Sequence, residues 1–194
     1  TARRKIGVSH HHGINTPIFS LRSENSLGIG EFLDLIPLID WASSLGLKVI
    51  QILPINDTGM SPSPYNALSS LALNPTYLSL SAIDGVKTIP SYLETKKRLQ
   101  TFDQEKLVLY SLIRKDKLRF LHEYFLRFSE DAKGFVAKII KKEPWVKIYA
   151  LFMALKEKNG LMSWLYWPDQ EKNPIDLEKL YEEQKSVWPF YAFL

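Results

Sequence analysis

Apolar residues recur with two different periods in the first part of the chain. The run Leu47–Leu53 is rich in β-branched residues and is typical of a strand buried on both faces, as in parallel sheets. Before it, apolar residues in Glu31–Leu45 fall at three- and four-residue steps, which predicts a helix with one apolar stripe. Gly13–Leu21 is predicted as an earlier short strand. This order predicts a βαβ unit with parallel strands and a right-handed crossover.

Glycine and proline set the expected limits of these elements. Gly46 follows the predicted helix as a C′ glycine that stops it. Pro37 lies within the helical pattern, so either a kink or a late helix start is expected. Pro54 ends the second strand because it has no N–H group to donate to the sheet.

From Tyr92 onward the composition changes, and a long helical stretch is predicted after it. Helices are predicted at Asp103–Phe128, Ala132–Lys142, Pro144–Lys158 and Asp176–Lys185. Asn159-Gly160 is expected to cap the third helix, Asn74-Pro75 to form a turn, and Trp164–Pro168 to form an aromatic loop. A sheet of only two strands cannot bury itself, so either the helices cover it or most of the sheet is missing.

Composition and charge exclude several functional classes. The chain has 194 residues and no cysteine, which excludes disulfides, thiolate metal sites and cysteine nucleophiles and fits a cytoplasmic setting. The net charge of +4 comes from 25 basic and 21 acidic residues that are interleaved, as on solvated helix faces. We therefore expect no nucleic-acid binding. No apolar run approaches the ~20 residues of a membrane span, so no membrane association is expected.

Two short motifs have both a functional and an ordinary interpretation. His10–His12 could suggest a metal site, but successive side chains point in different directions, so a flexible arm or an added segment is favoured. Gly28-x-Gly30 before a helix could bind phosphate, but Leu33 stands where a dinucleotide motif needs glycine. A loop that needs a positive φ or close packing is the favoured alternative. His122 is interpreted as a surface or partly satisfied histidine, and no metal or cofactor is expected.

The polar loop after Pro54 is the first candidate site, because loops at the carboxyl ends of parallel strands build ligand sites. The loops that follow Leu21 and Ile55 leave the sheet at one edge, so Asn15, Arg22 and Tyr65 are expected near one cleft. Asp57 is the acid of this loop. Glycoside hydrolysis needs two carboxylates, so one acid beside a tyrosine favours hydroxyl recognition over catalysis. The alternative for Asp57 is a turn-stabilising carboxylate.

Several separated motifs, in order, resemble the 4-α-glucanotransferases, which are also known as amylomaltases or disproportionating enzymes. The motifs are Gly13–Leu21, Leu27–Phe32, Ile52–Thr58, Ser63-Pro64-Tyr65 with Asn74-Pro75, and Tyr149–Lys156, together with Trp164 and Trp167-Pro168. The resemblance covers nearly the whole chain, and the combination is far more specific than any single motif.

The resemblance implies an α/β fold, namely the N-terminal part of a (β/α)8 TIM barrel with a largely helical insertion. Residues 1–90 are then the start of the barrel, with about two strands, and residues 91–194 the insertion. The family transfers α-1,4-glucan segments by a retaining double displacement with an Asp nucleophile, a Glu acid/base and a second Asp. These lie on later strands beyond Leu194, so no catalytic residue is assigned here. The apolar ending Trp188–Leu194 likewise predicts a truncated chain.

Substrate binding is what the resemblance transfers to this chain, with an α-1,4-glucan or malto-oligosaccharide as partner. Tyr65 is expected to stack on a glucose ring and Ser63 to hydrogen-bond a sugar hydroxyl, with Asp57 and Asn15 completing the substrate-binding set. The sequence Asn56-Asp57-Thr58 is the form found in a subset of the family. A second hypothesis is a non-catalytic glucan-binding or interaction module complete at this length. The oligomeric state is not predicted.

Overall fold

The computed structural model describes residues 11–194, so the basic segment Thr1–Lys5 and His10 lie outside the described residues. The chain divides into two units, one that ends at Phe120 and one that spans Leu121–Leu194, and each is described by itself. Over residues 11–194, no helix is both long and apolar enough to cross a membrane. In the same range no group of three or more histidine or acidic side chains is placed to hold a metal ion.

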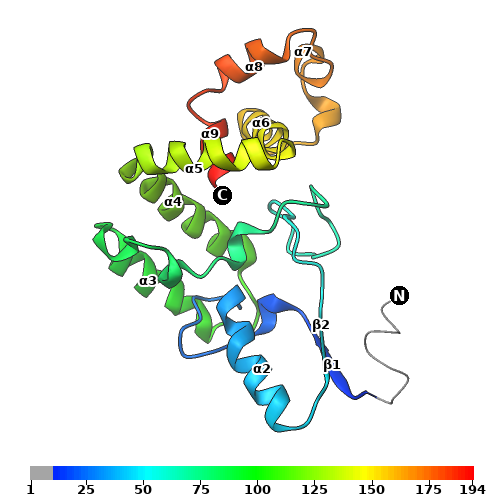
Figure 1. Cartoon of the computed structure of the whole chain (residues 1–194), viewed down its shortest axis with the longest axis vertical. Helices are drawn as coiled ribbons and strands as arrows, with labels where there is room; N and C mark the ends of the chain where they lie inside the picture. Colours follow the sequence, from blue (N-terminus) through cyan, green and yellow to red (C-terminus); the bar gives the residue numbers. More distant parts are fainter. Residues whose placement is uncertain (1–10) are drawn as a thin grey trace. The chain divides into compact units, whose positions relative to one another are not determined.

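The first unit contains the predicted βαβ unit (Figure 1). Strands β1 (Gly13–Thr16) and β2 (Val49–Ile52) pair in parallel, with Gly13 opposite Val49 and Thr16 opposite Ile52. Helix α2 (Leu35–Ser44) forms the connection between them. The parallel pairing predicted from the strand–helix–strand order is therefore confirmed.

Both strands are shorter than predicted, and neither is buried on both faces. Beyond Thr16 the chain turns into the 3-10 helix η1 (Ile18–Ser20), in which the Ser20 hydroxyl donates to the Pro17 carbonyl at 2.9 Å. Proline cannot donate to the sheet, so β1 stops there. Along β2 exposed and half-buried residues alternate, because among the described residues each strand has a single partner. The expectation of a doubly buried strand is wrong for this two-stranded sheet.

The predicted helix starts late, as Pro37 allowed. A 3-10 turn, η2 (Phe32–Asp34), precedes α2, and Pro37 falls in the first turn of α2, where its missing N–H costs nothing. Glu31 and Asp34 form a capping box in which the Glu31 amide donates to the Asp34 carboxylate at 2.7 Å. Gly46 follows the helix with φ +73°, the left-handed conformation expected of a C′ glycine.

The apolar stripe of α2 is present but uncovered within the described residues. Ile36, Ile39 and Leu45 are 57%, 54% and 60% exposed, whereas Ala42 is buried. The periodicity identified the helix correctly, but the apolar residues that would cover this face are not supplied by the first unit.

The rest of the first unit is built from short turns and two longer helices. These are η3 (Pro75–Tyr77), η4 (Leu80–Ala82), η5 (Val86–Thr88), α3 (Tyr92–Thr101), η6 (Phe102–Gln104) and α4 (Tyr110–Arg127), of which the residues after Phe120 belong to the second unit. The helix predicted from Asp103 begins only at Tyr110, after the 3-10 turn η6. Helix α3 was not predicted, and its Leu99 is fully buried while the Tyr92 ring contacts that of Phe120 at 5.9 Å.

The second unit is helical, close to the prediction. Its elements are α5 (Ser129–Lys142), α6 (Trp145–Lys158), η7 (Trp164–Tyr166), α7 (Asp169–Lys172), α8 (Leu177–Glu183) and α9 (Trp188–Phe193). Asp176 caps α8 by accepting from the Lys179 amide at 3.1 Å, and Gly160 ends the α6 segment with φ +64°. The short helices α7 and α9 were not predicted.

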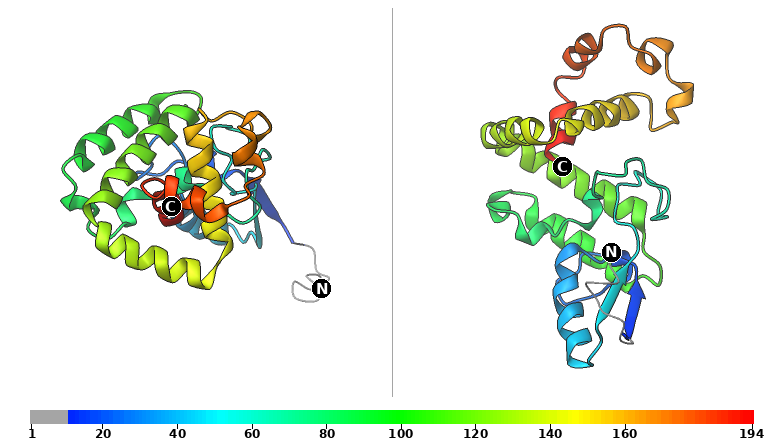
Figure 2. Two further views of the ribbon diagram at one scale, coloured as in Figure 1. Left: turned by 90° about the horizontal axis from the view of Figure 1, so that it is seen from above. Right: turned by 45° about the vertical axis from the view of Figure 1, so that its right-hand side comes forward.

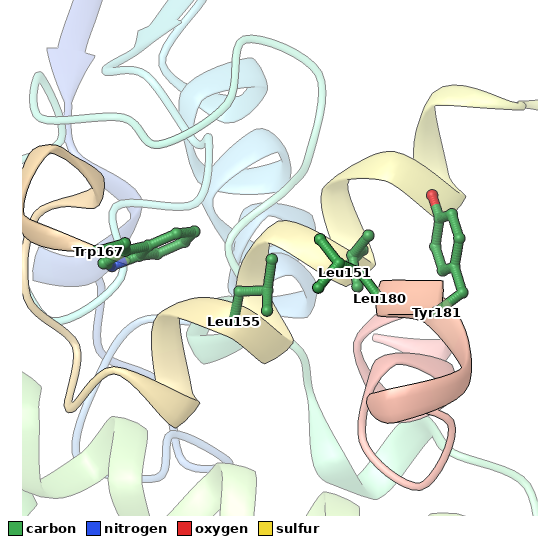
Figure 3. Packing of buried hydrophobic residues seen from close by; sticks show 5 residues of the cluster. All are labelled: Leu151, Leu155, Trp167, Leu180 and Tyr181. Atoms are coloured by element: carbon green, nitrogen blue, oxygen red, sulfur yellow. The ribbon is translucent and has the colours of Figure 1, made fainter. Parts of the chain in front are cut away.

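Helix α6 forms the centre of the second unit. Its Leu151 and Leu155 pack in one buried cluster with Trp167, Leu180 and Tyr181, as Figure 3 shows. A second cluster joins Val136 of α5, Ala150 of α6 and Ala192 of α9. The aromatic segment after α6 therefore contributes Trp167 to the core, whereas Trp164 and Tyr166 are exposed.

Candidate functional site

A long irregular segment leaves the carboxyl end of β2 (Figure 2, right view). Its two ends are joined by backbone hydrogen bonds from the Asp57 amide to the Ala72 carbonyl and from the Asn74 amide to the Ile55 carbonyl, both at 2.9 Å. Residues 57–72 therefore form a closed loop, here called the polar loop, and the paired segments at its ends are called the neck. Compact loops of this kind with adjoining ends are frequently functional.

The polar loop is ordered by its own polar groups. The Leu68 amide donates to the Asp57 carbonyl at 2.7 Å, and the Thr58 hydroxyl donates to the Ser61 carbonyl at 2.7 Å. The side-chain amide of Asn66 donates to the Ser61 hydroxyl at 3.1 Å. Since these contacts stay within the loop, its conformation is set largely by local sequence.

The predicted site residues lie in different surroundings. Tyr65 is 70% exposed at the outer end of the polar loop, and Ser63 is half-buried beside it. Asn15 is exposed on β1, opposite Gln51. Arg22 donates through Nη1 to the carbonyls of Phe19 and Leu21, so its head group is engaged by backbone. The gathering of Asn15, Arg22 and Tyr65 in one cleft stays a prediction.

Asp57 is 3% exposed and lies in the neck. Its Oδ1 accepts from the Gly59 amide at 2.8 Å, and the same oxygen lies 3.0 Å from Nη2 of Arg114. The Gly59 backbone has φ +57°, a left-handed conformation that glycine adopts without strain. These contacts support the turn-stabilising alternative for Asp57, and a direct contact with sugar stays a prediction.

Buried side chains on one face of α4 contact the neck and the residues that follow it. The charged residues on this face were not predicted from the sequence. Arg114 and Lys117 are 2% and 0% exposed, although the basic residues of the helical segments were interpreted as solvated. With Tyr110 and Leu121 they fall at helical steps of three and four residues, so they share one stripe. The burial of Arg114 and Lys117 could have been predicted from their position, because they fall on the same helical face as the apolar residues of α4.

Arg114 and Tyr110 contact both segments of the neck. The Arg114 guanidinium donates from Nη1 to the side-chain oxygens of Asn74 and Thr76 at 3.0 and 3.1 Å, and from Nη2 to the Asp57 carboxylate. The Tyr110 hydroxyl accepts from the Asn74 side-chain amide at 2.9 Å and donates to the Gly59 carbonyl at 3.0 Å. This network is fully buried, so its hydrogen bonds are not in competition with water.

Lys117 and Glu31 form a buried ion pair next to the segment that follows the neck. The Lys117 ammonium also donates to the carbonyls of Thr76 and Leu78 at 2.8 and 3.0 Å. Loss of solvation on burial raises the pKa of Glu31 and lowers the pKa of Lys117, while each partner's charge acts in the opposite direction. The pair ties the start of η2 to the segment after the polar loop.

Each unit has a surface cavity among the described residues. One of about 290 Å³ lies between Pro62 of the polar loop and Val108–Leu112 at the start of α4. The other, of about 500 Å³, is lined by residues of α7, α8 and the segment between them. None of Asn15, Ser63 and Tyr65 lines either cavity.

Comparison with known proteins identifies relatives along nearly the whole chain. A family model described as 4-alpha-glucanotransferase matches residues 16–194. The 4-alpha-glucanotransferase of Chlamydia pneumoniae is 38% identical over 201 residues, which cover 100% of this chain and 38% of the relative. That of Chlamydia trachomatis is 38% identical over 186 residues, covering 94% of this chain and 35% of the relative. The chain thus spans little more than a third of the length of these relatives.

Solved structures show the same fold. An amylomaltase from Streptococcus agalactiae, in complex with acarbose, matches with a TM-score of 0.77 at 23% identity and covers 95% of this chain and 38% of that chain. An amylomaltase from Corynebacterium glutamicum matches with a TM-score of 0.73 at 20% identity, over 100% of this chain and 28% of that chain. The family match over residues 16–194, the sequence relatives and the shared fold lead to one conclusion: the chain belongs to the 4-alpha-glucanotransferase family.

Proposed function

We propose that this chain is the part of a 4-α-glucanotransferase that holds and orients an α-1,4-glucan. The observation that carries the proposal is the family match over residues 16–194, in a chain whose polar loop leaves the carboxyl end of a parallel strand. In this proposal β1 and β2 are the first strands of a (β/α)8 barrel and residues 91–194 are a helical insertion. Active sites of such barrels lie at the carboxyl ends of the strands.

The proposed reaction moves a glucan segment from a donor to an acceptor. One α-1,4 bond breaks and an equivalent bond forms at the 4-hydroxyl of the acceptor, so the exchange needs no cofactor. Two displacements, the first by a carboxylate nucleophile, retain the configuration at the anomeric carbon. The resemblance to the family assigns the reacting carboxylates to later barrel strands, which leaves substrate binding to the residues of this chain.

Tyr65 and Ser63 are the proposed sugar contacts. An exposed tyrosine ring can stack on the C–H face of a glucose unit, and the neighbouring hydroxyl can exchange hydrogen bonds with the sugar. The exposure of Tyr65 on an internally hydrogen-bonded loop supports this role, because a loop that is already ordered loses little backbone freedom when it binds. The acarbose complex of the Streptococcus agalactiae amylomaltase supports a saccharide ligand for this fold.

The complete protein that carries this chain is expected to disproportionate maltotriose, converting two molecules into glucose and maltopentaose. Chromatography of the oligosaccharides and an assay for glucose measure both products. The 194-residue chain alone is expected to release no glucose. Binding of malto-oligosaccharides by the complete protein without any change in their chain lengths would favour the module hypothesis and overturn the transferase.

Tyr65→Ala in the complete enzyme is expected to lower kcat/KM for maltotriose by about fivefold or more, since it removes stacking worth on the order of 1 kcal/mol. Steady-state kinetics check this. Tyr166→Ala is the matched control, because Tyr166 is also a highly exposed tyrosine but lies in the second unit. Unchanged kinetics for Tyr65→Ala, or equal losses for both variants, would contradict the role of Tyr65.

A further inference from the structure

The polar loop is fixed in space by side chains that come from a different part of the sequence. Its internal hydrogen bonds determine its conformation, but they do not determine where it lies relative to the sheet. The neck joins its own two segments through backbone hydrogen bonds, which likewise do not fix its place relative to the sheet. Buried side chains of α4 provide the remaining connection.

Arg114 is suited to this connection by the shape of its guanidinium. Nη2 reaches Asp57, at the entry of the polar loop, and Nη1 reaches Asn74 and Thr76, just past its exit. One rigid, planar group therefore fixes both ends of the loop at once. A lysine ammonium carries the same charge but lacks the fork needed to hold both ends.

Tyr110 adds a second fixed point one helical turn earlier. Its hydroxyl lies between the Asn74 side-chain amide and the Gly59 carbonyl, and 3.1 Å from the Thr58 hydroxyl. Arg114 and Tyr110 thus share Asn74 as a partner. Neither residue lies at the outer end of the loop, where Tyr65 is exposed.

We propose that Arg114 is a positioning residue for glucan transfer, with Tyr110 as its helper: it sets the place of the polar loop, and thereby of Tyr65, against the sugar. The inference rests on the proposed function, because it assigns the loop to substrate. Arg114 does not contact the glucan; it acts through Asp57 and Asn74. A small displacement of a group that orients the substrate is enough to lower the rate strongly.

The test is a double-mutant cycle between Arg114→Lys and Tyr65→Ala in the complete enzyme, with kcat/KM for maltotriose as the readout. Arg114→Lys is expected to lower kcat/KM by about fivefold in the otherwise unchanged enzyme, close to the loss from Tyr65→Ala, because it acts through the placement of Tyr65. In the Tyr65→Ala background the same change is expected to cost less than about twofold, because a misplaced loop matters little once its ring is gone. A role in stability alone would give equal losses in both backgrounds.

Arg98→Lys is the matched control, because it also alters an arginine–aspartate pair, formed by Arg98 of α3 with Asp116 of α4 at 2.5 Å, but away from the polar loop. It is expected to leave kcat/KM unchanged. Tyr110→Phe removes only the hydroxyl and is combined with Tyr65→Ala in the same way. If Arg114→Lys does not fold, this second double-mutant cycle tests the positioning role.

Equal losses in the two backgrounds, or no loss from Arg114→Lys, overturn the positioning role while transfer itself stands. If Arg114→Lys lowers kcat/KM but Tyr65→Ala does not, Arg114 does not act through Tyr65. The proposed contact between Tyr65 and the sugar is then overturned as well. Absence of transfer in the unaltered enzyme identifies a failure of the proposed function, and the positioning role falls with it.

Discussion

Replacing Lys117 by methionine is expected to lower the free energy of unfolding by about 3–5 kcal/mol, the range for breaking a buried ion pair at one partner. Lys117 is fully buried, and its ammonium meets the Glu31 carboxylate and two backbone carbonyls. Methionine fills much of the space but leaves a buried negative charge and two acceptors without their donor. Urea denaturation of the complete protein measures the loss through the midpoint.

Lys115→Met on the same helix is the control, since Lys115 is exposed and its loss should change the unfolding free energy by no more than about 0.5 kcal/mol. The double variant Glu31→Gln, Lys117→Met is expected to recover much of the stability, because no uncompensated charge remains. If the double variant is no more stable than Lys117→Met, the buried charge of Glu31 is not the cause of the loss.

The loss from Lys117→Met should also depend on pH. Burial already raises the pKa of Glu31 in the folded protein, and Lys117 opposes that rise. Without Lys117 the folded pKa of Glu31 rises further above its unfolded value, so the neutral acid is favoured by folding. Stability from such a group is present below the unfolded pKa and is lost as pH rises through the folded pKa. The destabilisation should therefore be smaller at acidic pH than at pH 8, and a loss independent of pH would contradict this account.

Gly30→Ala is expected to destabilise the protein by about 3 kcal/mol, at the upper end of the usual cost of adding a carbon to a packed site. A Cβ at Gly30 would lie 1.9 Å from the Ile18 carbonyl oxygen and 2.9 Å from the Cβ of Leu21. The backbone at Gly30 has no positive φ, so space and not backbone strain sets the cost. The Gly30 amide donates to the Phe19 carbonyl at 3.2 Å, and this contact should break.

Gly134→Ala is the matched control, because a Cβ at Gly134 in α5 meets nothing within 4 Å. There the same substitution should stabilise the helix by about 0.5–1 kcal/mol. Denaturation midpoints and hydrogen exchange of the amides in residues 18–30 separate the two cases. Equal effects of both substitutions would show that the packing at Gly30 is not as close as the structure has it.

The sequence predicted the elements better than their surroundings. Periodicity located α2, α5, α6 and α8, α2 has the late start that Pro37 allowed, and Gly46 correctly marked its C-terminal end. The packing at Gly30 agrees with the choice of close backbone approach over phosphate binding in Gly28-x-Gly30. The predicted burial of β2 was wrong, and the apolar stripe of α2 is exposed. The local sequence pattern shows which face of an element is apolar, but it does not show whether another element covers that face.

The sequence predicted the polar loop of the candidate site but not the buried residues of α4 that contact it. The polar loop could be predicted from its polar residues after a strand, and the resemblance pointed to Ser63 and Tyr65 within it. Arg114 and Lys117 could not be separated from solvated residues by local charge. Their partners, Asp57 and Glu31, lie far away in sequence. Only the tertiary structure brings these pairs together, so no short window of sequence contains the information.

The distance along the chain between these partners has a consequence for folding. Arg114 meets Asp57 across 57 residues, and Lys117 meets Glu31 across 86 residues. Contacts of such long range close large loops and form late, after local helices. During synthesis on the ribosome the polar loop would be made well before α4 emerges, so its buried polar groups must remain hydrated until that helix docks.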